Sequence, residues 1–152
     1  METTTRTLPV QSPAFNHNGY IPVQYTCDGD NINPPLEVSE IPDETKSLAL
    51  IVEDPDAPDG VFDHWLIWNL PPDKAIAEKT IEGTTGINGF GQTGYGGPCP
   101  PDDVHRYFFK FYALDTELGL APGENKTSLL EAMRGHILAS GVLIGRYDRE
   151  KN

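Results

Sequence analysis

The sequence predicts a mainly β protein: an antiparallel β-sandwich with Greek-key connections and one helix near the C-terminus. Several short stretches rich in apolar and β-branched residues are separated by clusters of turn residues. Glycine occurs 15 times and proline 14 times among 152 residues, which favours turns and short strands over long helices. One stretch, starting near residue 128, carries the signals of a helix. A chain of this length is expected to form one domain over residues 1–152.

The first third of the chain predicts short strands and turns. We expect an edge strand around residues 6–10, a second strand over 21–27 and a third over 36–41. Between them, residues 28–35 form a dense cluster of turn residues. Their acidic side chains resemble those of a calcium loop, but the glutamate that an EF-hand requires twelve positions after its first ligand is missing. An ordered surface turn is therefore the better interpretation.

Residues 47–70 predict a hairpin. The apolar run at 47–53 is typical of a buried strand, and the two prolines at 55 and 58 prevent it from continuing. Side chains alternate between the two faces of a strand. One face of the first strand therefore carries Leu48, Leu50, Val52 and Asp54. One face of the second strand carries Phe62, His64, Leu66 and Trp68. Antiparallel pairing then brings Asp54 close to His64 at the rim of an apolar core, which is how small-ligand pockets are built.

Residues 71–103 predict little regular structure. Their glycine-rich run from 86 to 97 lacks both the GxxxxGK[ST] pattern and the following helix of a phosphate loop. Residues 105–114 then carry the strongest strand signal in the chain, with His105 and Tyr107 on one aromatic face and Arg106 on the other.

The last segment predicts a helix and a closing strand. Ser128 and Glu131 have the spacing of a capping box, so we expect a helix from residue 128 to about 140, with Leu130, Met133 and Ile137 at core spacing. Gly141 is interpreted as its stop, and residues 142–147 as the final strand.

Composition limits the classes of function. The formal charge of −12 argues against nucleic acid and against adsorption to anionic membranes, both of which need clustered basic residues. No apolar run is long enough to span a bilayer, and the N-terminus has no signal-peptide pattern, so we expect a cytoplasmic protein without integral membrane association. Cys27 and Cys99 are then expected as reduced thiols, and neither has a metal-ligand spacing.

Four chemical interpretations compete for Asp54, His64, His105 and Tyr107. The imidazoles, the tyrosine hydroxyl and amides of the glycine-proline loop could bind an anion, with Asp54 orienting His64 or donating a proton itself. A hydrolase would use the same histidines, but the sequence offers no GxSxG motif, and Cys99 lies between prolines without an evident activating group. The third interpretation is a His/Asp metal site, and the fourth a protein-interaction module with an incidental pocket. Asp56 is interpreted as structural support, paired with Arg106.

The motifs at these positions resemble those of the phosphatidylethanolamine-binding protein family, also called the Raf kinase inhibitor-like family, in its bacterial and archaeal branch. They are DPDAP at 54–58, DHW at 63–65, GGPCPP at 96–101 and HRY at 105–107, supported by YTCDG at 25–29 and NPP at 33–35. The resemblance covers residues 12 to 147, and the order and spacing of the motifs are specific.

The resemblance implies an antiparallel β-sandwich with a surface pocket for phosphate-like anions. By position, its lining would be Asp54, Ala57, Pro58, His64, Gly97, Cys99, His105 and Tyr107. Family members bind phospholipid head groups and modulate kinases or serine proteases, and they are generally not enzymes. Residues 148–152 leave no room for the C-terminal helix that covers the pocket in eukaryotic relatives, and Asp102 and Asp103 are expected near the mouth.

We therefore expect a non-catalytic protein that binds a small anion, phosphate or a phosphorylated head group, without a metal or cofactor. The alternative is an inhibitor or regulator of a serine protease or kinase that acts through the glycine-proline loops. A metal-dependent or cysteine hydrolase is the third candidate. The sequence leaves a homodimer open.

Overall fold

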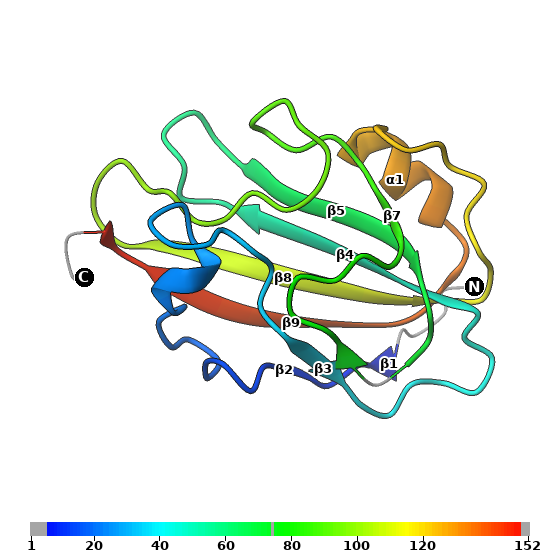
Figure 1. Cartoon of the computed structure of the whole chain (residues 1–152). Coiled ribbons are helices and arrows are strands. Elements are labelled where there is room, and N and C mark those ends of the chain that lie inside the picture. Colours follow the sequence, from blue (N-terminus) through cyan, green and yellow to red (C-terminus); the bar gives the residue numbers. More distant parts are fainter. Residues whose placement is uncertain (1–5, 74, 150–152) are drawn as a thin grey trace.

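The computed structural model describes residues 6–73 and 75–149, and in these residues it is mainly β (Figure 1). A six-stranded sheet has the order β1-β9-β8-β4-β5-β7, and a three-stranded sheet the order β2-β3-β6. The elements are β1 (Arg6–Thr7), β2 (Val10–Gln11), the 3-10 turn η1 (Val23–Tyr25), β3 (Leu36–Val38), β4 (Ser47–Asp54), β5 (Phe62–Leu70), β6 (Ala75–Ile76), β7 (Thr84–Thr85), β8 (His105–Leu114), α1 (Lys126–Met133) and β9 (Ile137–Tyr147).

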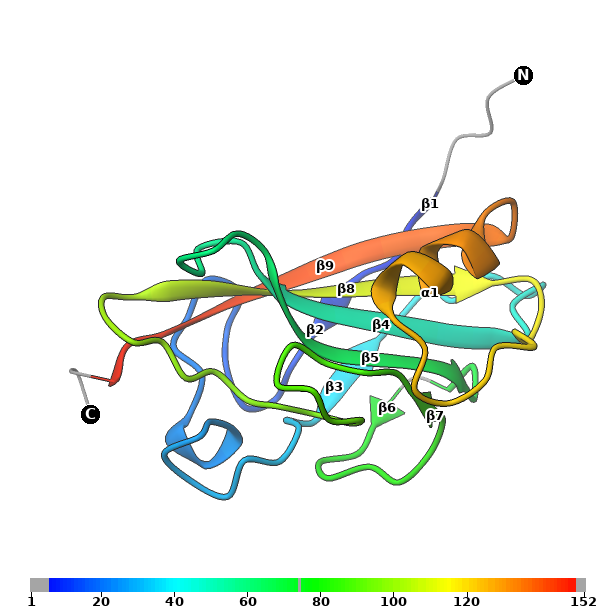
Figure 2. The same ribbon diagram turned by 90° about the horizontal axis from the view of Figure 1, so that it is seen from above.

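The large sheet lies between the small sheet and the helix (Figure 2). The core between the two sheets contains the aromatic side chains Trp65, Phe109 and Phe111. A smaller core under the helix joins Leu129 and Met133 of α1 to the other face of the large sheet. These layers confirm the predicted sandwich with one helix near the C-terminus.

The order of strands also fits the predicted Greek-key connections. After the β4–β5 hairpin, a long connection returns the chain so that β8 pairs with β4 and not with β5. The pairs among β4, β5, β8 and β9 are antiparallel. The edge strand β1 is an exception to the antiparallel prediction, because it runs parallel to β9.

A one-residue bulge in β5 determines which way His64 points. Val52 of β4 pairs with Trp65, whereas the next residue of β4, Glu53, pairs with Asp63, so His64 is the extra residue. The expectation that His64 shares a face with Leu66 and Trp68 is therefore wrong. Those two side chains pack under the helix. The bulge turns His64 to the face between the sheets, toward Tyr107.

The N-terminal expectations need three corrections. The segment around residues 6–10 is two short strands in different sheets, with Pro9 at the crossing. Residues 21–27 contain a 3-10 turn instead of a strand, since the amide of Thr26 and its hydroxyl both bond to the carbonyl of Val23. The strand predicted over 36–41 ends at Val38.

The helix is shorter and starts earlier than predicted. Asn125 caps it, with its side-chain oxygen accepting from the amide of Ser128, so Ser128 is not the cap. The helix ends before Gly135, which has φ of +81°, a left-handed conformation that glycine adopts at helix ends. Gly141 lies inside β9 opposite Phe111 and is no stop. The core residues are Leu129 and Met133, while Leu130 is exposed.

Two further expectations concern residues outside the described ranges. The expected absence of a signal-peptide pattern involves residues 1–5, and the expected lack of room for a C-terminal helix involves residues 150–152. Within the described part of the chain, no helix is long and apolar enough to cross a membrane.

Candidate functional site

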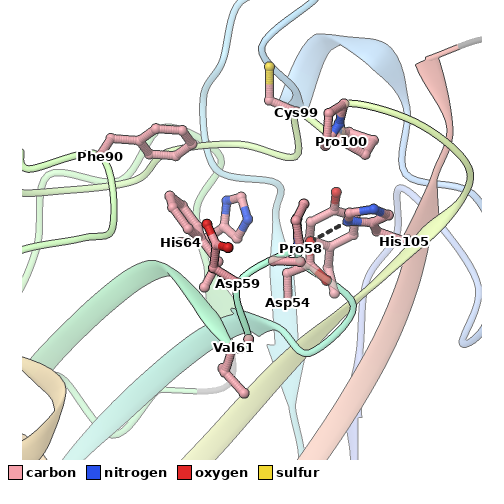
Figure 3. Close-up of a pocket in the computed structure, with 14 residues that line it drawn as sticks. Asp54, Pro58, Asp59, Val61, His64, Phe90, Cys99, Pro100 and His105 are labelled. Atoms are coloured by element: carbon pink, nitrogen blue, oxygen red, sulfur yellow. Dashed lines mark hydrogen bonds and ion pairs between the residues drawn. The ribbon is translucent and has the colours of Figure 1, made fainter.

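The structure forms a cavity of about 260 Å³ where the end of β4 and the starts of β5 and β8 meet the loops at residues 55–61 and 86–104 (Figure 3). All of the predicted lining residues except Gly97 reach it. The complete lining is Asp54, Ala57, Pro58, Asp59, Gly60, Val61, Phe62, His64, Phe90, Cys99, Pro100, Pro101, His105 and Tyr107. Its polar side chains come from strands of the large sheet, except Asp59 of the loop between β4 and β5, and proline and glycine loops form much of its rim.

Asp54 and His105 form a buried pair at the floor of the cavity. His105 Nδ1 lies 2.6 Å from Asp54 Oδ2, and both side chains are almost fully buried. The other carboxylate oxygen of Asp54 accepts from the amide of Asp56 at 2.7 Å. Asp54 was expected to orient His64, and this is wrong: the carboxylate holds His105 instead (dashed line in Figure 3).

His64 is held by the backbone of the opposite loop. Its Nδ1 lies 2.7 Å from the carbonyl oxygen of Gly96, and only 3% of the residue is exposed. Because a carbonyl can only accept, Nδ1 carries the hydrogen. Burial lowers the pKa of His64, and the nearby carbonyls and the carboxylates of Asp54 and Asp63 offset this only in part. His64 is therefore neutral at pH 7.

Tyr107 lies between the two imidazoles with a hydroxyl that has no protein partner. Its ring centroid is 5.2 Å from that of His64 and 6.5 Å from that of His105. The side chain is fully buried, and its hydroxyl is one of three buried side-chain polar atoms in the described residues without a hydrogen bond. Burial raises the pKa of Tyr107, so the hydroxyl keeps its proton as a donor. Buried hydroxyls usually find partners, so a ligand group is the natural occupant of this position.

Gly97 does not line the cavity, because its backbone packs against the loop at residues 25–31. Its amide donates to Asn31 Oδ1 at 2.8 Å, and a side chain at Gly97 would collide with that oxygen and with the carbonyl of Tyr25. The Gly97 amide is consequently not available as the anion donor that the sequence suggested. Glycine is needed here for close packing of two loops.

Cys27 and Cys99 form a disulfide, so the expectation of reduced thiols is wrong. Figure 3 shows the sulfur of Cys99 directed away from the two imidazoles. The cysteine-hydrolase interpretation therefore lacks the free thiol that it requires. The bridge joins the loop beside the cavity to the segment after η1, and the amide of Cys27 also donates to the carbonyl of Pro98.

Asp56 and Arg106 form the predicted pair outside the cavity. Arg106 donates through Nε and through its terminal nitrogen to the two carboxylate oxygens, each at 2.9 Å, and its backbone amide adds a third bond. The hydrogen bond from Arg106 lowers the pKa of Asp56. The pair ties the loop after β4 to the start of β8 and so fixes the spacing of Asp54 and His105.

An aromatic side of the cavity was not predicted. Phe62 and Phe90 pack at 4.8 Å between ring centroids, and both contact His64, at 4.9 and 5.6 Å. Phe62 could have been found, because it alternates with His64 on the strand. Phe90 gives no such signal, since it lies in the glycine-rich run, where no strand pattern assigns it to a face. The amides of Gly89 and Gly96 fasten that run to the backbone of β5.

The charges of the cavity are unusual for an anion site. No lysine or arginine is among the described lining residues, whereas Asp54 and Asp59 are. Asp102 and Asp103, expected near the mouth, are exposed and do not line the cavity. Among the residues that the structure describes, no group of three or more His, Cys, Asp or Glu is arranged to hold a metal ion.

Comparison with known proteins identifies a family and several similar proteins. The phosphatidylethanolamine-binding protein family matches residues 11–148. A UPF0098 protein of Methanothermobacter thermautotrophicus is 52% identical over 150 residues, covering 93% of this chain and 99% of that protein. A UPF0098 protein of Pyrococcus horikoshii is 48% identical, covering 91% of this chain and 76% of that protein.

Solved structures share the fold. A homolog of phosphatidylethanolamine-binding protein from Chlamydia trachomatis superposes with a TM-score of 0.90 at 46% identity, covering 95% of this chain and 99% of that one. Escherichia coli YbcL, described as a member of the mammalian PEBP family, superposes with a TM-score of 0.84 at 26% identity, covering 93% and 98%. With a family match over most of its length, this chain belongs to the phosphatidylethanolamine-binding protein family.

Proposed function

We propose that the protein is a non-catalytic binding protein whose cavity takes one small anionic group, phosphate or a phosphorylated head group. The observation that carries this proposal is the buried Tyr107 hydroxyl, which has no protein partner and lies between the imidazoles of His64 and His105. A buried donor of this kind is costly to leave unpaired, and a ligand oxygen would satisfy it.

The remaining geometry supports a small polar head with an apolar attachment. Two imidazoles and a hydroxyl converge on about 260 Å³, which holds a group of a few atoms rather than a long chain. Phe62, Phe90 and the loop prolines supply apolar walls, and Phe90 is 48% exposed. Family membership agrees with a binding role.

Titration with inorganic phosphate, followed by NMR of the histidine rings, tests the proposal. We expect the signals of His64 and His105 to shift. His17 and His136 are internal controls, because their rings bond to the amide of Ile144 and to Asp115 outside the cavity. No response at either His64 or His105, at phosphate concentrations that leave the controls unchanged, would remove the pocket from consideration.

A second candidate function is regulation of a serine protease or kinase through the loops around the cavity. Its supporting observation is that two apolar side chains at the rim, Val61 and Phe90, are 54% and 48% exposed. A pull-down with Val61→Ser/Phe90→Ser, compared with Tyr107→Phe, separates the two functions. Loss of a partner with the rim variant alone would favour regulation by surface contact.

We also propose a cytoplasmic location, and the Cys27–Cys99 bridge is the observation that stands against it. Disulfides persist mainly in oxidising compartments, with hyperthermophiles as an exception. Rapid alkylation of thiols in intact cells, followed by mass spectrometry, reports the bridge, and cell fractionation reports the compartment. Recovery of the chain outside the cytoplasm would overturn the proposal.

A further inference from the structure

The hydrogen-bond partner of His64 fixes which of its ring nitrogens carries the hydrogen. Nδ1 of His64 donates to the Gly96 carbonyl, which cannot donate in return. In a neutral ring the other nitrogen, Nε2, then carries only a lone pair. His64 thus offers the cavity an acceptor, although an anion site ordinarily offers donors.

The surroundings of His64 keep the ring neutral. Asp54 faces it from β4, Asp59 lines the cavity from the following loop, and Asp63 is its neighbour on β5. His105 and Tyr107 approach from β8, and the loop at residues 96–101 contributes backbone and prolines without charge. Burial outweighs the attraction of the carboxylates and lowers the pKa of His64 below its ordinary value.

The other two polar groups differ in whether their hydrogens are available to a ligand. The Tyr107 hydroxyl keeps its hydrogen and has no protein acceptor. The hydrogen on Nδ1 of His105 is already donated to Asp54, so it is not available to a ligand. The cavity therefore presents a donor at Tyr107 and an acceptor at Nε2 of His64, and no lysine or arginine is among its described lining residues.

Building on the proposed function, we propose that the cavity selects a phosphoryl group that still carries a proton, inorganic phosphate or a phosphate monoester, and that this proton is donated to Nε2 of His64. Such a group has one O–H donor for His64 and an acceptor oxygen for Tyr107. Sulfate and phosphodiesters have acceptor oxygens alone at neutral pH, so one of them would meet the lone pair of His64. His64 therefore distinguishes ligands by whether they carry a hydrogen on a phosphate oxygen, and not by their net charge.

Inorganic phosphate and sulfate are the matched probes, because they have the same tetrahedral shape and, as dianions at pH 8, the same charge, but only hydrogen phosphate has an O–H. By calorimetry at pH 7 and pH 8 we expect phosphate to bind about tenfold more tightly than sulfate, or more. Affinities within about twofold of each other would overturn the inference while leaving the anion pocket in place. Binding of neither ion would instead overturn the proposed function.

A second pair of probes distinguishes a monoester from a lipid-derived diester. Phosphoethanolamine and glycerophosphoethanolamine share the ammonium group, but only the monoester can carry a phosphate proton near pH 6. At pH 7 about nine-tenths of the free monoester is unprotonated, given a second pKa of about 6. Calorimetry in buffers of different ionisation enthalpy should therefore show uptake of about 0.9 more proton for the monoester than for the diester. Equal uptake with equal affinity would contradict the inference.

The variant His64→Gln tests the acceptor directly, since a glutamine amide can turn its NH₂ group to an anion. We expect the ratio of phosphate to sulfate affinity to fall toward one, mainly because sulfate binds better. His136→Gln, outside the cavity, is the matched control and should keep the wild-type ratio. If the His64→Gln protein folds, binds phosphate and keeps the wild-type ratio of phosphate to sulfate affinity, His64 does not accept the phosphate proton.

Discussion

At the scale of single residues, two tyrosines on the same side of the sheet separate ligand binding from stability. The Tyr95 hydroxyl donates to the carbonyl of Tyr25 at 2.6 Å, whereas the Tyr107 hydroxyl has no partner. Tyr95→Phe should therefore lower the free energy of unfolding by about 1 kcal/mol with little change in phosphate affinity. Tyr107→Phe should leave the melting temperature unchanged or raised.

The Tyr107→Phe protein should also bind phosphate about fivefold more weakly, because the ligand loses one hydrogen bond. Thermal unfolding and calorimetry on the two variants measure both quantities. Wild-type phosphate affinity in Tyr107→Phe would mean that the hydroxyl is an unpaired core group without a ligand role.

A second prediction concerns Asp56, which Arg106 holds through three hydrogen bonds. The guanidinium lowers the pKa of the carboxyl in the folded state. The pair therefore adds stability above the ordinary pKa of an aspartate, about 4, and loses it as pH falls through the lower folded value. Asp56→Asn should be slightly less stable than the wild type at pH 7, since the pair is partly exposed and screened by solvent.

Urea unfolding at pH 7 and near pH 2 checks this expectation. The two proteins should differ at pH 7 and approach each other in acid, with Glu131→Gln as a control for an exposed surface pair. A constant difference across the range would mean that the backbone contact, and not the charge, carries the effect.

The orientation of the His64 side chain could not be predicted from the sequence. The alternating pattern correctly placed Asp54 at the end of one apolar stripe and His105 at the start of another, because β4 and β8 pair in continuous register up to Glu53 and Phe108. It could not predict the bulge in β5, since Trp65 and Leu66 are both apolar and either phase of the strand buries a large side chain. The bulge in β5, which the types of residue in this strand do not reveal, directs the His64 side chain into the cavity.

At the scale of elements, the loop at residues 95–99 is the part of the site most dependent on tertiary contacts. It has almost no regular structure, yet it holds His64 through the Gly96 carbonyl. The disulfide of Cys99 and hydrogen bonds from Tyr95, Gly97 and Cys27 attach it to the segment at 25–31. The glycine and proline residues predicted a stiff loop here, but the sequence did not indicate which segment the loop contacts.

Replacing both cysteines by serine tests this attachment. The bridge closes a loop with a sequence separation of 72, so its removal should lower the free energy of unfolding by about 4 kcal/mol. Phosphate affinity should also fall, because the Gly96 carbonyl becomes less well placed. Calorimetry on the folded Cys27→Ser/Cys99→Ser protein measures this. Unchanged phosphate affinity would show that the hydrogen bonds alone position the loop.

The helix shows why boundaries are harder to predict than elements. Asn125 and Ser128 are both good capping residues, and Gly135 and Gly141 are both plausible stops. The choice is made by the fold: β9 must begin at Ile137 to pair with Leu114 of β8. The helix is therefore confined to the residues between that strand and the preceding loop.

At the scale of the whole molecule, the layers followed from the sequence because each long strand carries its own pattern. β4 and β8 were predicted over nearly their full lengths, as both are rich in apolar residues and end at turn signals. In the small sheet, β6 was not predicted, and β2 and β3 were predicted only within longer strands, because these strands are two or three residues long and are defined by their neighbours. Such strands exist through pairing rather than through local preference.

The acid response of the whole protein combines opposing charges, and His64 can be isolated from it. Protonation relieves the repulsion within a chain of formal charge −12, which favours the folded state as pH falls. Burial lowers the folded pKa of His64 below the ordinary value of about 6.5, so between these values the unfolded state binds more protons. Stability from this residue therefore falls as pH decreases below about 6.5.

Melting temperatures of the wild type and of His64→Gln, measured without phosphate between pH 7.5 and 5, separate this contribution from the net charge. The wild type should lose more stability, or gain less, than the variant over this interval, while His136→Gln should follow the wild type. Parallel curves for wild type and His64→Gln would mean that the folded ring takes up its proton as readily as the unfolded one. His64 would then be an added cation in the cavity in acid, and its role as a proton acceptor for phosphate would be lost.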